Sequence, residues 1–183
     1  MGIKRICKYG DKILSKKTNK VDFKQIKDKL SEILRDMEDT LSAVKGLGLA
    51  ANQIGLDLQL SIIRITDKDG KVIKFTIINP VIVEKKGEIY EDEGCLSFPG
   101  LFAKVKRYSE VKVKALNEKG LPIEIKGNGL LARVLQHEID HLNGITFIDR
   151  LPLFTRLKLK PVLLKLKRQW KKIDESKVIP KEM

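Results

Sequence analysis

Hydrophobic residues recur every three or four positions from Asp22 to Lys45, which is the spacing of a helix with one buried face. The positions in this stripe are Phe23, Ile26, Leu30, Ile33, Leu34, Met37, Leu41 and Val44. Asp22, with Gln25 three residues later, resembles a capping box, and Gly46 supplies a stop. The segment is therefore predicted to be a helix whose apolar stripe lies on the core.

The pattern changes after this helix to short runs that are β-branched or alternate between apolar and polar residues. Turn residues such as Asn79-Pro80 and Lys119-Gly120 separate them. The runs are Leu60–Ile65, Phe75–Ile78, Val81–Val83, Val111–Leu116 and Ile123–Ile125. We expect strands that pair mostly antiparallel.

Two more helices are predicted toward the C-terminus. One runs from about Gly129 to Leu142, and the other covers about residues 152–175, where Pro161 either starts a new helix or kinks a longer one. Helix, strands, helix and tail helix in this order favour an α+β fold, with mostly antiparallel sheets around the central helix. No repeat or linker divides the sequence, so residues 1–183 are predicted to form one domain.

Composition narrows the class of protein. The chain has 183 residues, 42% of them hydrophobic, which excludes wholesale disorder, and no apolar stretch approaches the roughly 18 residues of a membrane span. Two cysteines, Cys7 and Cys95, cannot make a disulfide framework, and no signal-peptide core follows the N-terminus. We expect a cytoplasmic protein without a disulfide partner or a membrane partner.

Positive charge is unevenly distributed. Lys and Arg number 37 against 24 Asp and Glu, a net charge of +13. The tail segment is especially rich in cations, at Arg156, Lys158, Lys160, Lys165, Lys167, Arg168, Lys171 and Lys172. This segment is either a solvated lysine-rich surface or the part of the chain that meets an anionic partner such as RNA.

The two histidines of the chain, His137 and His141, stand four residues apart in the predicted central helix. This spacing projects both imidazoles from one face, and Glu138 completes the pattern H-E-x-x-H. In that pattern the histidines bind a metal ion and the glutamate handles a proton of the bound water. The alternative is an ordinary amphipathic helix whose histidines are partly buried and hydrogen-bonded.

A catalytic metal site needs a third protein ligand, which here must be Cys, Asp or Glu because no histidine remains. The longer zinc-protease pattern fails, because Phe147 stands where it requires a third histidine. Asp149 follows the helix too closely. Cys95, held in the turn Glu93–Ser97, is the better candidate.

A third unusual stretch, Gly46 to Gly55, is small and apolar and contains Gln53. It could be a close-packed connection that needs glycine for backbone freedom. It could also pair its bare backbone at Leu47 and Gly48 with an extended peptide, while Gln53 aims a donor at a polarised carbonyl.

These three segments together resemble peptide deformylase, a metal-dependent hydrolase that removes the N-formyl group from the formyl-methionine of new polypeptides and releases formate. The motifs of that family are G-x-G-x-A-A-x-Q, E-G-C-L-S and H-E-x-D-H, which stand here at Gly46–Gln53, Glu93–Ser97 and His137–His141. The resemblance extends over nearly the full chain. It implies nascent formyl-methionyl peptides as substrates.

The resemblance also implies a role for each matching residue. Three residues hold the metal: Cys95, His137 and His141. Glu138 is the general acid/base, and Gln53 and the Leu96 N–H stabilise the oxyanion. The residues expected to bind substrate or line the methionine pocket are Leu47, Gly48, Gly94, Leu130 and Val134. A supporting ion pair joins Glu93 to Arg107, with Asp140 near it.

The family resemblance favours Fe(II) as the native ion, while zinc, nickel and cobalt also suit one thiolate and two imidazoles. Phe98 and Phe102 depart from the commonest bacterial pattern, in which many members carry arginine at the second position, and this affects peptide preference. Arg133 lies either at the pocket mouth or on a solvated helix face. Two other functions compete: a zinc metallopeptidase, and a basic ribosome- or RNA-binding protein with a structural metal. The basic tail could also hold a deformylase at the ribosome.

Overall fold

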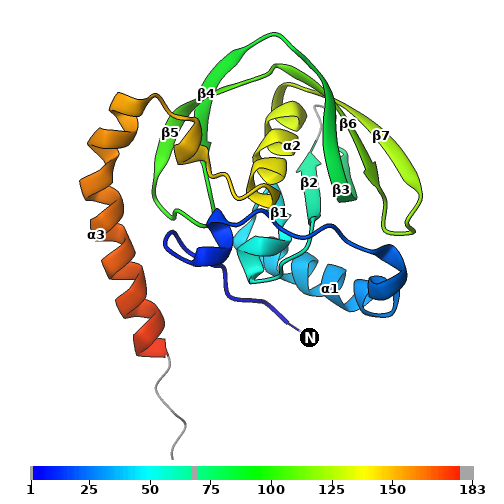
Figure 1. Ribbon diagram of the computed structural model, residues 1–183, viewed down its shortest axis with the longest axis horizontal. Helices are drawn as coiled ribbons and strands as arrows, with labels where there is room; N and C mark the ends of the chain where they lie inside the picture. The colour runs from blue at the N-terminus through cyan, green and yellow to red at the C-terminus, as the bar shows by residue number, and fades with distance from the viewer. Residues whose placement is uncertain (1, 67–69, 178–183) are drawn as a thin grey trace, which may run out of the picture.

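The computed structural model describes residues 2–66 and 70–177 and has an α+β architecture (Figure 1). The strands are β1 Gly48–Ala50, β2 Leu60–Thr66, β3 Val72–Lys86, β4 Ile89–Gly94, β5 Phe102–Arg107, β6 Glu110–Leu116 and β7 Pro122–Asn128. The α-helices are α1 Phe23–Val44, α2 Gly129–Leu142 and α3 Leu153–Lys177. Three short 3₁₀ helices are η1 Lys12–Ser15, η2 Ala51–Ile54 and η3 Phe147–Arg150.

All strand pairs in the described residues are antiparallel and form two sheets. The larger sheet has the order β1-β2-β3-β6-β7, and β4 pairs with β5 in a separate two-stranded sheet. Figure 1 shows α2 in the middle, between the larger sheet and the β4-β5 pair. The apolar face of α2 packs on the inner residues of β2, β3 and β6 in one buried cluster. The predicted α+β fold with a central helix is confirmed.

Helix α1 forms where its apolar stripe predicts it, but its ends differ in detail. Asp22 caps the helix by accepting from the Lys24 N–H, rather than through a reciprocal box with Gln25. Lys45 takes the left-handed conformation at the C-terminal cap, with φ of 53°. Gly46 is needed for a different reason, because a Cβ there would lie 2.7 Å from the Leu41 side chain.

The strands at 75–78 and 81–83 were predicted separately but are one long strand, β3. The chain continues past Pro80 because a register shift between Ile78 and Val81 absorbs the irregularity. Asn79 adopts φ of 52° there, and its side chain bonds both the N–H and the carbonyl of Val21. Strands β1 and β5 were not predicted, and the run before Cys95 looked strand-like but was not given as a strand; β1 is very short, and β4 is rich in acidic residues.

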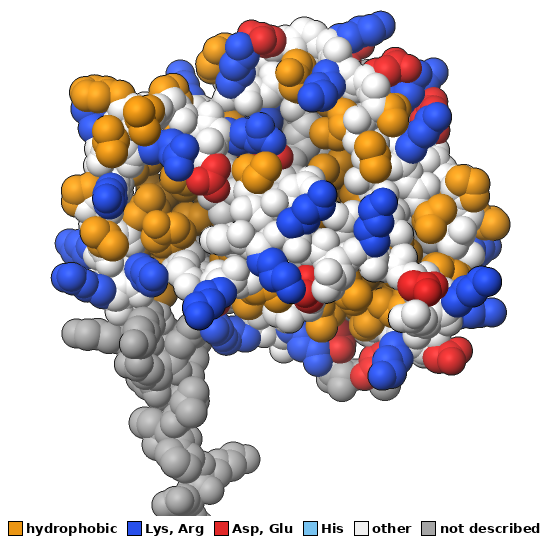
Figure 2. Space-filling model, viewed as in Figure 1, with side chains coloured by type: hydrophobic (Ala, Val, Ile, Leu, Met, Phe, Trp, Pro, Cys, Tyr) orange, Lys and Arg blue, Asp and Glu red, His pale blue; other side chains and the backbone are white. Residues whose placement is uncertain are grey.

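Helix α3 is continuous through Pro161, so the proline lies inside one helix rather than between two. Its inner face packs on the body through Leu163, which is 4% exposed and shares a buried cluster with Phe98 and Phe147. Its outer face carries exposed apolar side chains among its cations (Figure 2). The side chains of Lys171 and Lys172 lie outside the described part. No helix within the described ranges has the length and hydrophobicity that a bilayer crossing requires.

Candidate active site

Helix α2 brings its histidines to one face, and the turn after β4 brings Cys95 to meet them. The ligand atoms of Cys95, His137 and His141 all lie within 4.8 Å of one another. The Cys95 Sγ is 3.1 Å from the His141 Nε2. The turn is closed by the Phe98 N–H, which donates to the Cys95 carbonyl at 2.8 Å. Cys95 therefore joins two histidines that lie 42 and 46 positions later in the sequence, and the three form one cluster of soft and borderline ligands.

The electrostatics of this cluster suit a divalent transition metal. Burial opposes charge on the Cys95 thiol, but His141 and hydrogen bonds with both imidazoles lower its pKa well below the ordinary value. Burial likewise opposes charge on His137, but its bonds with Cys95 and Glu93 raise its pKa well above the ordinary value. A divalent metal ion held by these groups would take the place of the protons that they share, because cysteine and histidine bind metals as thiolate and neutral imidazole.

Glu138 is 3% exposed and lies beside this cluster. Burial raises the pKa of its carboxyl group above the usual range, so the group holds a proton more readily than an exposed glutamate does. Its Oε2 has no hydrogen-bond partner among the described residues. Its Oε1 occupies the space over Gly48, where a Cβ would lie only 2.5 Å away. Glycine at position 48 thus makes room for the carboxylate.

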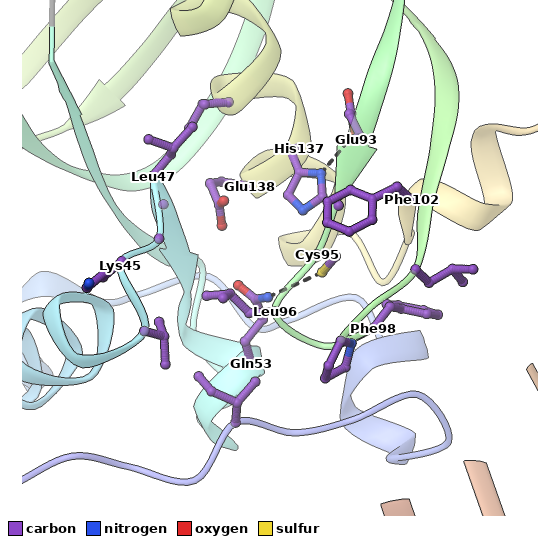
Figure 3. A pocket seen from close by; sticks show the side chains of 18 of the residues that line it. Lys45, Leu47, Gln53, Glu93, Cys95, Leu96, Phe98, Phe102, His137 and Glu138 are labelled. Atoms are coloured by element: carbon purple, nitrogen blue, oxygen red, sulfur yellow. Dashed lines mark hydrogen bonds and ion pairs between the residues drawn. The ribbon is translucent and has the colours of Figure 1, made fainter. Parts of the chain in front are cut away.

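Gln53 reaches the cluster from η2. Its Oε1 accepts from the Ala50 N–H at 2.9 Å, which fixes the amide so that the Nε2 faces the Cys95 Sγ at 3.6 Å and the Ser97 Oγ at 3.3 Å. Figure 3 shows Gln53 and Cys95 on one side of the pocket, and His137 and Glu138 entering from α2. The side-chain amide therefore directs its N–H groups toward the cluster of Cys95, His137 and His141.

Strand β1 lies at the edge of its sheet and pairs only with β2. The Leu47 carbonyl accepts from the Arg64 N–H at 2.8 Å, so this group is already paired within the protein. Backbone groups alternate in direction along a strand, so those of Gly48 point to the open edge. An extended peptide can add to this edge as another strand.

A pocket of about 600 Å³ opens over the cluster. The apolar side chains in its lining include Leu47, Leu96, Phe102, Leu130 and Val134. Gly94 lies directly under Phe102, because a Cβ at Gly94 would meet the Phe102 ring at 2.5 Å. Arg133 also lines the pocket, and it forms an ion pair with Glu91. The expected substrate residues therefore share one pocket.

A buried ion-pair network contacts His137, one of the three candidate metal ligands. Arg107 donates to Glu93 at 2.7 and 3.0 Å and to Asp140 at 2.5 Å. His137 Nδ1 lies 3.0 Å from the Glu93 Oε2, so the carboxylate fixes the orientation of the imidazole. Burial opposes ionisation of Glu93, but the bonds from His137 and Arg107 lower its pKa to about 2.

Sequence reasoning missed two parts of this network. Arg150 in η3 donates to both oxygens of Asp140, at 2.9 and 2.5 Å. The bond between His137 and Glu93 was also not foreseen. The only signal in the sequence was that Arg150 and Glu93 are ionisable residues close to or within a motif. Nothing in the neighbouring sequence distinguishes them from solvated side chains.

Comparison with known proteins gives a consistent result. A family model described as polypeptide deformylase matches residues 3–156. The peptide deformylase of Elusimicrobium minutum is 47% identical over 175 residues, which cover 93% of this chain and 99% of that protein. The peptide deformylase of Aquifex aeolicus is 49% identical over 150 residues, covering 81% and 88%.

Solved structures agree with the sequence matches. The crystal structure of a peptide deformylase from Legionella pneumophila has a TM-score of 0.81 and 43% identity, and the match covers 93% of this chain and 98% of that one. A class I type b peptide deformylase from Acinetobacter baumannii, with Met-Ala-Ser bound, has a TM-score of 0.76 and 31% identity over 81% and 98% of the chains. Because the family model spans most of the sequence and the relatives match over most of their length, the chain belongs to the polypeptide deformylase family, whose metal-dependent enzymes remove the N-formyl group from new polypeptides.

Proposed function

We propose that this chain hydrolyses the formamide of N-terminal formyl-methionine, with Cys95, His137 and His141 holding the catalytic metal. The observation that carries this proposal is the convergence of that cluster with Glu138 on one pocket, beside the open edge of β1. A zinc peptidase would use the same helix motif. A peptidase function would not explain why the third ligand is the thiolate of Cys95, which lies in a turn that also lines the pocket.

A divalent ion bound by these ligands lowers the pKa of a water molecule and polarises a carbonyl group. We propose Fe(II) as the native ion, since the thiolate and imidazole donors suit it and the family resemblance favours it. A ferrous site with a thiolate ligand is open to oxidation at the iron and at the sulfur. Metal analysis after purification without oxygen tests this, and activity that persists in air without catalase or reductant would contradict it.

Glu138 is proposed as the general acid/base. Its carboxylate accepts a proton from the attacking water and then delivers one to the amine that leaves. The raised pKa supports this role, because a carboxyl group that ionises nearer neutrality returns a proton more readily. Its unpartnered Oε2 leaves an oxygen available to the reacting groups.

Negative charge develops on the formyl oxygen as the carbonyl carbon becomes tetrahedral. We propose that the Gln53 Nε2 and the Leu96 N–H stabilise this charge. The Gln53 amide is held through its own oxygen, so its Nε2 already points at the cluster, and the formyl oxygen would replace the Ser97 Oγ or the Cys95 Sγ as an acceptor. Leu96 directly follows Cys95 and lines the same pocket.

The peptide is proposed to bind in extended form between β1 and the end of β4. Backbone groups of Gly48 and Gly94 pair with it, and Leu47 contributes its side chain, since its carbonyl is occupied by Arg64. Leu130 and Val134, one turn apart on α2, line the pocket for the methionine side chain. Glu93, Arg107 and Asp140 act indirectly, by holding His137.

The deciding experiment measures formate released from formyl-Met-Ala-Ser by anaerobically purified protein. We expect wild-type turnover with about one metal per chain, and Glu138→Ala should keep the metal but lose most of the turnover. Glu88→Ala is the matched control, because Glu88 is an exposed acid paired with Lys106 away from the cluster. Near-wild-type activity in Glu138→Ala would remove this residue from the mechanism. Cleavage of internal peptide bonds without formate release would favour the peptidase.

We also propose that the chain acts as one catalytic unit in the cytoplasm and meets the ribosome through α3. The helix packs Leu163 into the body, so truncation would damage the core, whereas Lys158, Lys160 and Lys165 are exposed. Replacing these three lysines with glutamine should reduce co-sedimentation with ribosomes at low salt, because polyanion binding depends on such cations. Formate release from free peptide should stay unchanged. Unaltered co-sedimentation would mean that α3 is only a solvated surface.

A further inference from the structure

Three consecutive residues near the N-terminus connect the glycine-rich loop to the cysteine turn. The Cys7 N–H donates to the Gln53 carbonyl at 2.7 Å, and the Tyr9 N–H donates to the Ser97 carbonyl at 3.0 Å. Between them, the Lys8 ammonium donates to the Leu96 carbonyl at 2.9 Å. The segment therefore contacts both elements that supply the proposed oxyanion donors.

Lys8 donates to a peptide group that also contacts the sulfur of Cys95. The Leu96 carbonyl and the Ser97 N–H belong to the same planar peptide unit. The carbonyl accepts from Lys8, and the Ser97 N–H donates to the Cys95 Sγ at 3.4 Å. A charged donor on the carbonyl oxygen polarises the unit, which makes its N–H a stronger donor to sulfur.

We propose that Lys8 is a positioning residue for deformylation. It holds the Leu96–Ser97 peptide group so that the Ser97 N–H points at the Cys95 sulfur, and it fixes the turn from which the Leu96 N–H faces the substrate. This inference rests on the proposed role of Cys95 as a metal ligand. Hydrogen bonds to a ligating thiolate reduce the electron density that it donates and so tune the metal.

The other cations in the pocket lining do not take this position. Arg133 is directed to Glu91, and Lys45 caps the end of α1. Lys8 also lines the pocket, so direct contact with the peptide is the competing role. A substrate contact would change KM, whereas a residue that acts through Cys95 would change the metal site even without substrate.

The experiment compares Lys8→Met with Lys8→Arg and with Lys4→Met in cobalt-loaded protein. Methionine keeps much of the aliphatic stem and removes the charge, and arginine restores a cationic donor. Lys4 is the control, because it lies in the same segment but pairs with Asp36 on α1. The readouts are the sulfur-to-cobalt charge-transfer band, and kcat and KM for formyl-Met-Ala-Ser.

We expect Lys8→Met to move the charge-transfer band to longer wavelength, because a weaker bond from Ser97 leaves the sulfur electrons less stabilised. It should also lower kcat by about tenfold with little change in KM, because a sulfur that donates more electron density makes the metal a weaker Lewis acid. Lys8→Arg and Lys4→Met should resemble wild type. Lys8→Gln keeps a neutral donor, so its charge-transfer band should shift by an intermediate amount. Thermal unfolding followed by circular dichroism verifies that each variant is folded.

Two results overturn the proposal. An unshifted band in folded Lys8→Met shows that Lys8 does not act on the Cys95 sulfur. A raised KM with unchanged kcat makes Lys8 a peptide contact instead. Absence of a thiolate band in the wild-type protein would be a different failure, because it would remove Cys95 from the metal ligands and contradict the proposed function itself.

Discussion

Replacing Arg107 with methionine tests the buried ion-pair network. The side chains of Arg107, Glu93 and Asp140 are 3%, 4% and 8% exposed, so the charges are almost fully removed from water. The substitution removes the cation that bonds both carboxylates and keeps most of the aliphatic volume. Asp140 retains Arg150, whereas His137 is the one partner that Glu93 keeps among the described residues. Glu93 therefore becomes a buried carboxylate with too little compensation.

Breaking a buried ion pair by removing one partner costs about 3–5 kcal/mol, so we expect a loss of about 4 kcal/mol in the free energy of unfolding. The assay is urea unfolding followed by circular dichroism at pH 7, with metal saturating in every sample. Lys106→Met is the matched control. Lys106 is the adjacent cation, but it pairs with Glu88 where both side chains are about half exposed, so its loss should leave the free energy of unfolding nearly unchanged.

A second substitution separates lost pairing from lost packing. Adding Glu93→Gln to Arg107→Met removes the uncompensated charge and should recover part of the lost stability, whereas a packing defect would remain. A loss below about 1 kcal/mol in Arg107→Met, or no recovery in the double variant, would refute this account of the network.

Three further predictions concern the same site. Gly48→Ala places a methyl group 2.5 Å from the Glu138 Oε1, so it should displace the carboxylate and lower kcat while the metal content stays near one per chain. Formate release and metal analysis measure these two quantities, and a wild-type rate of formate release would refute the prediction. The pKa of Glu93 is about 2 in the folded state, below the ordinary 4.5, so its ion pairs contribute stability that is present above about pH 5 and lost as the pH falls toward 2. That contribution is about 3 kcal/mol, and urea unfolding between pH 3 and 7 should show a smaller pH dependence in Glu93→Gln. Cys95→Ser should lose most metal affinity in a chelator competition, and unchanged affinity would exclude Cys95 as a ligand.

The sequence by itself determined the elements whose signals are local. The apolar stripes of α1 and α2 and the spacing of His137 and His141 depend on helical periodicity, which is a property of neighbouring residues. The absence of another histidine limited the third ligand to Cys, Asp or Glu, and the turn around Cys95 made it the better candidate. The three motifs together were enough to identify the family.

Only the tertiary structure decided the contacts that join distant segments. Strand β4 is rich in acidic residues, and its sequence does not show which element it meets, yet it carries Glu93 to His137, 44 residues away. Strand β3 continues through Pro80 by a register shift, and next to the proline Asn79 is held by Val21 from another part of the chain. Lys8 resembles any surface lysine in the sequence, and only the fold places it on Leu96, 88 residues away. Periodicity reports which face of an element is buried, but it carries no information about which distant polar group completes a hydrogen bond there.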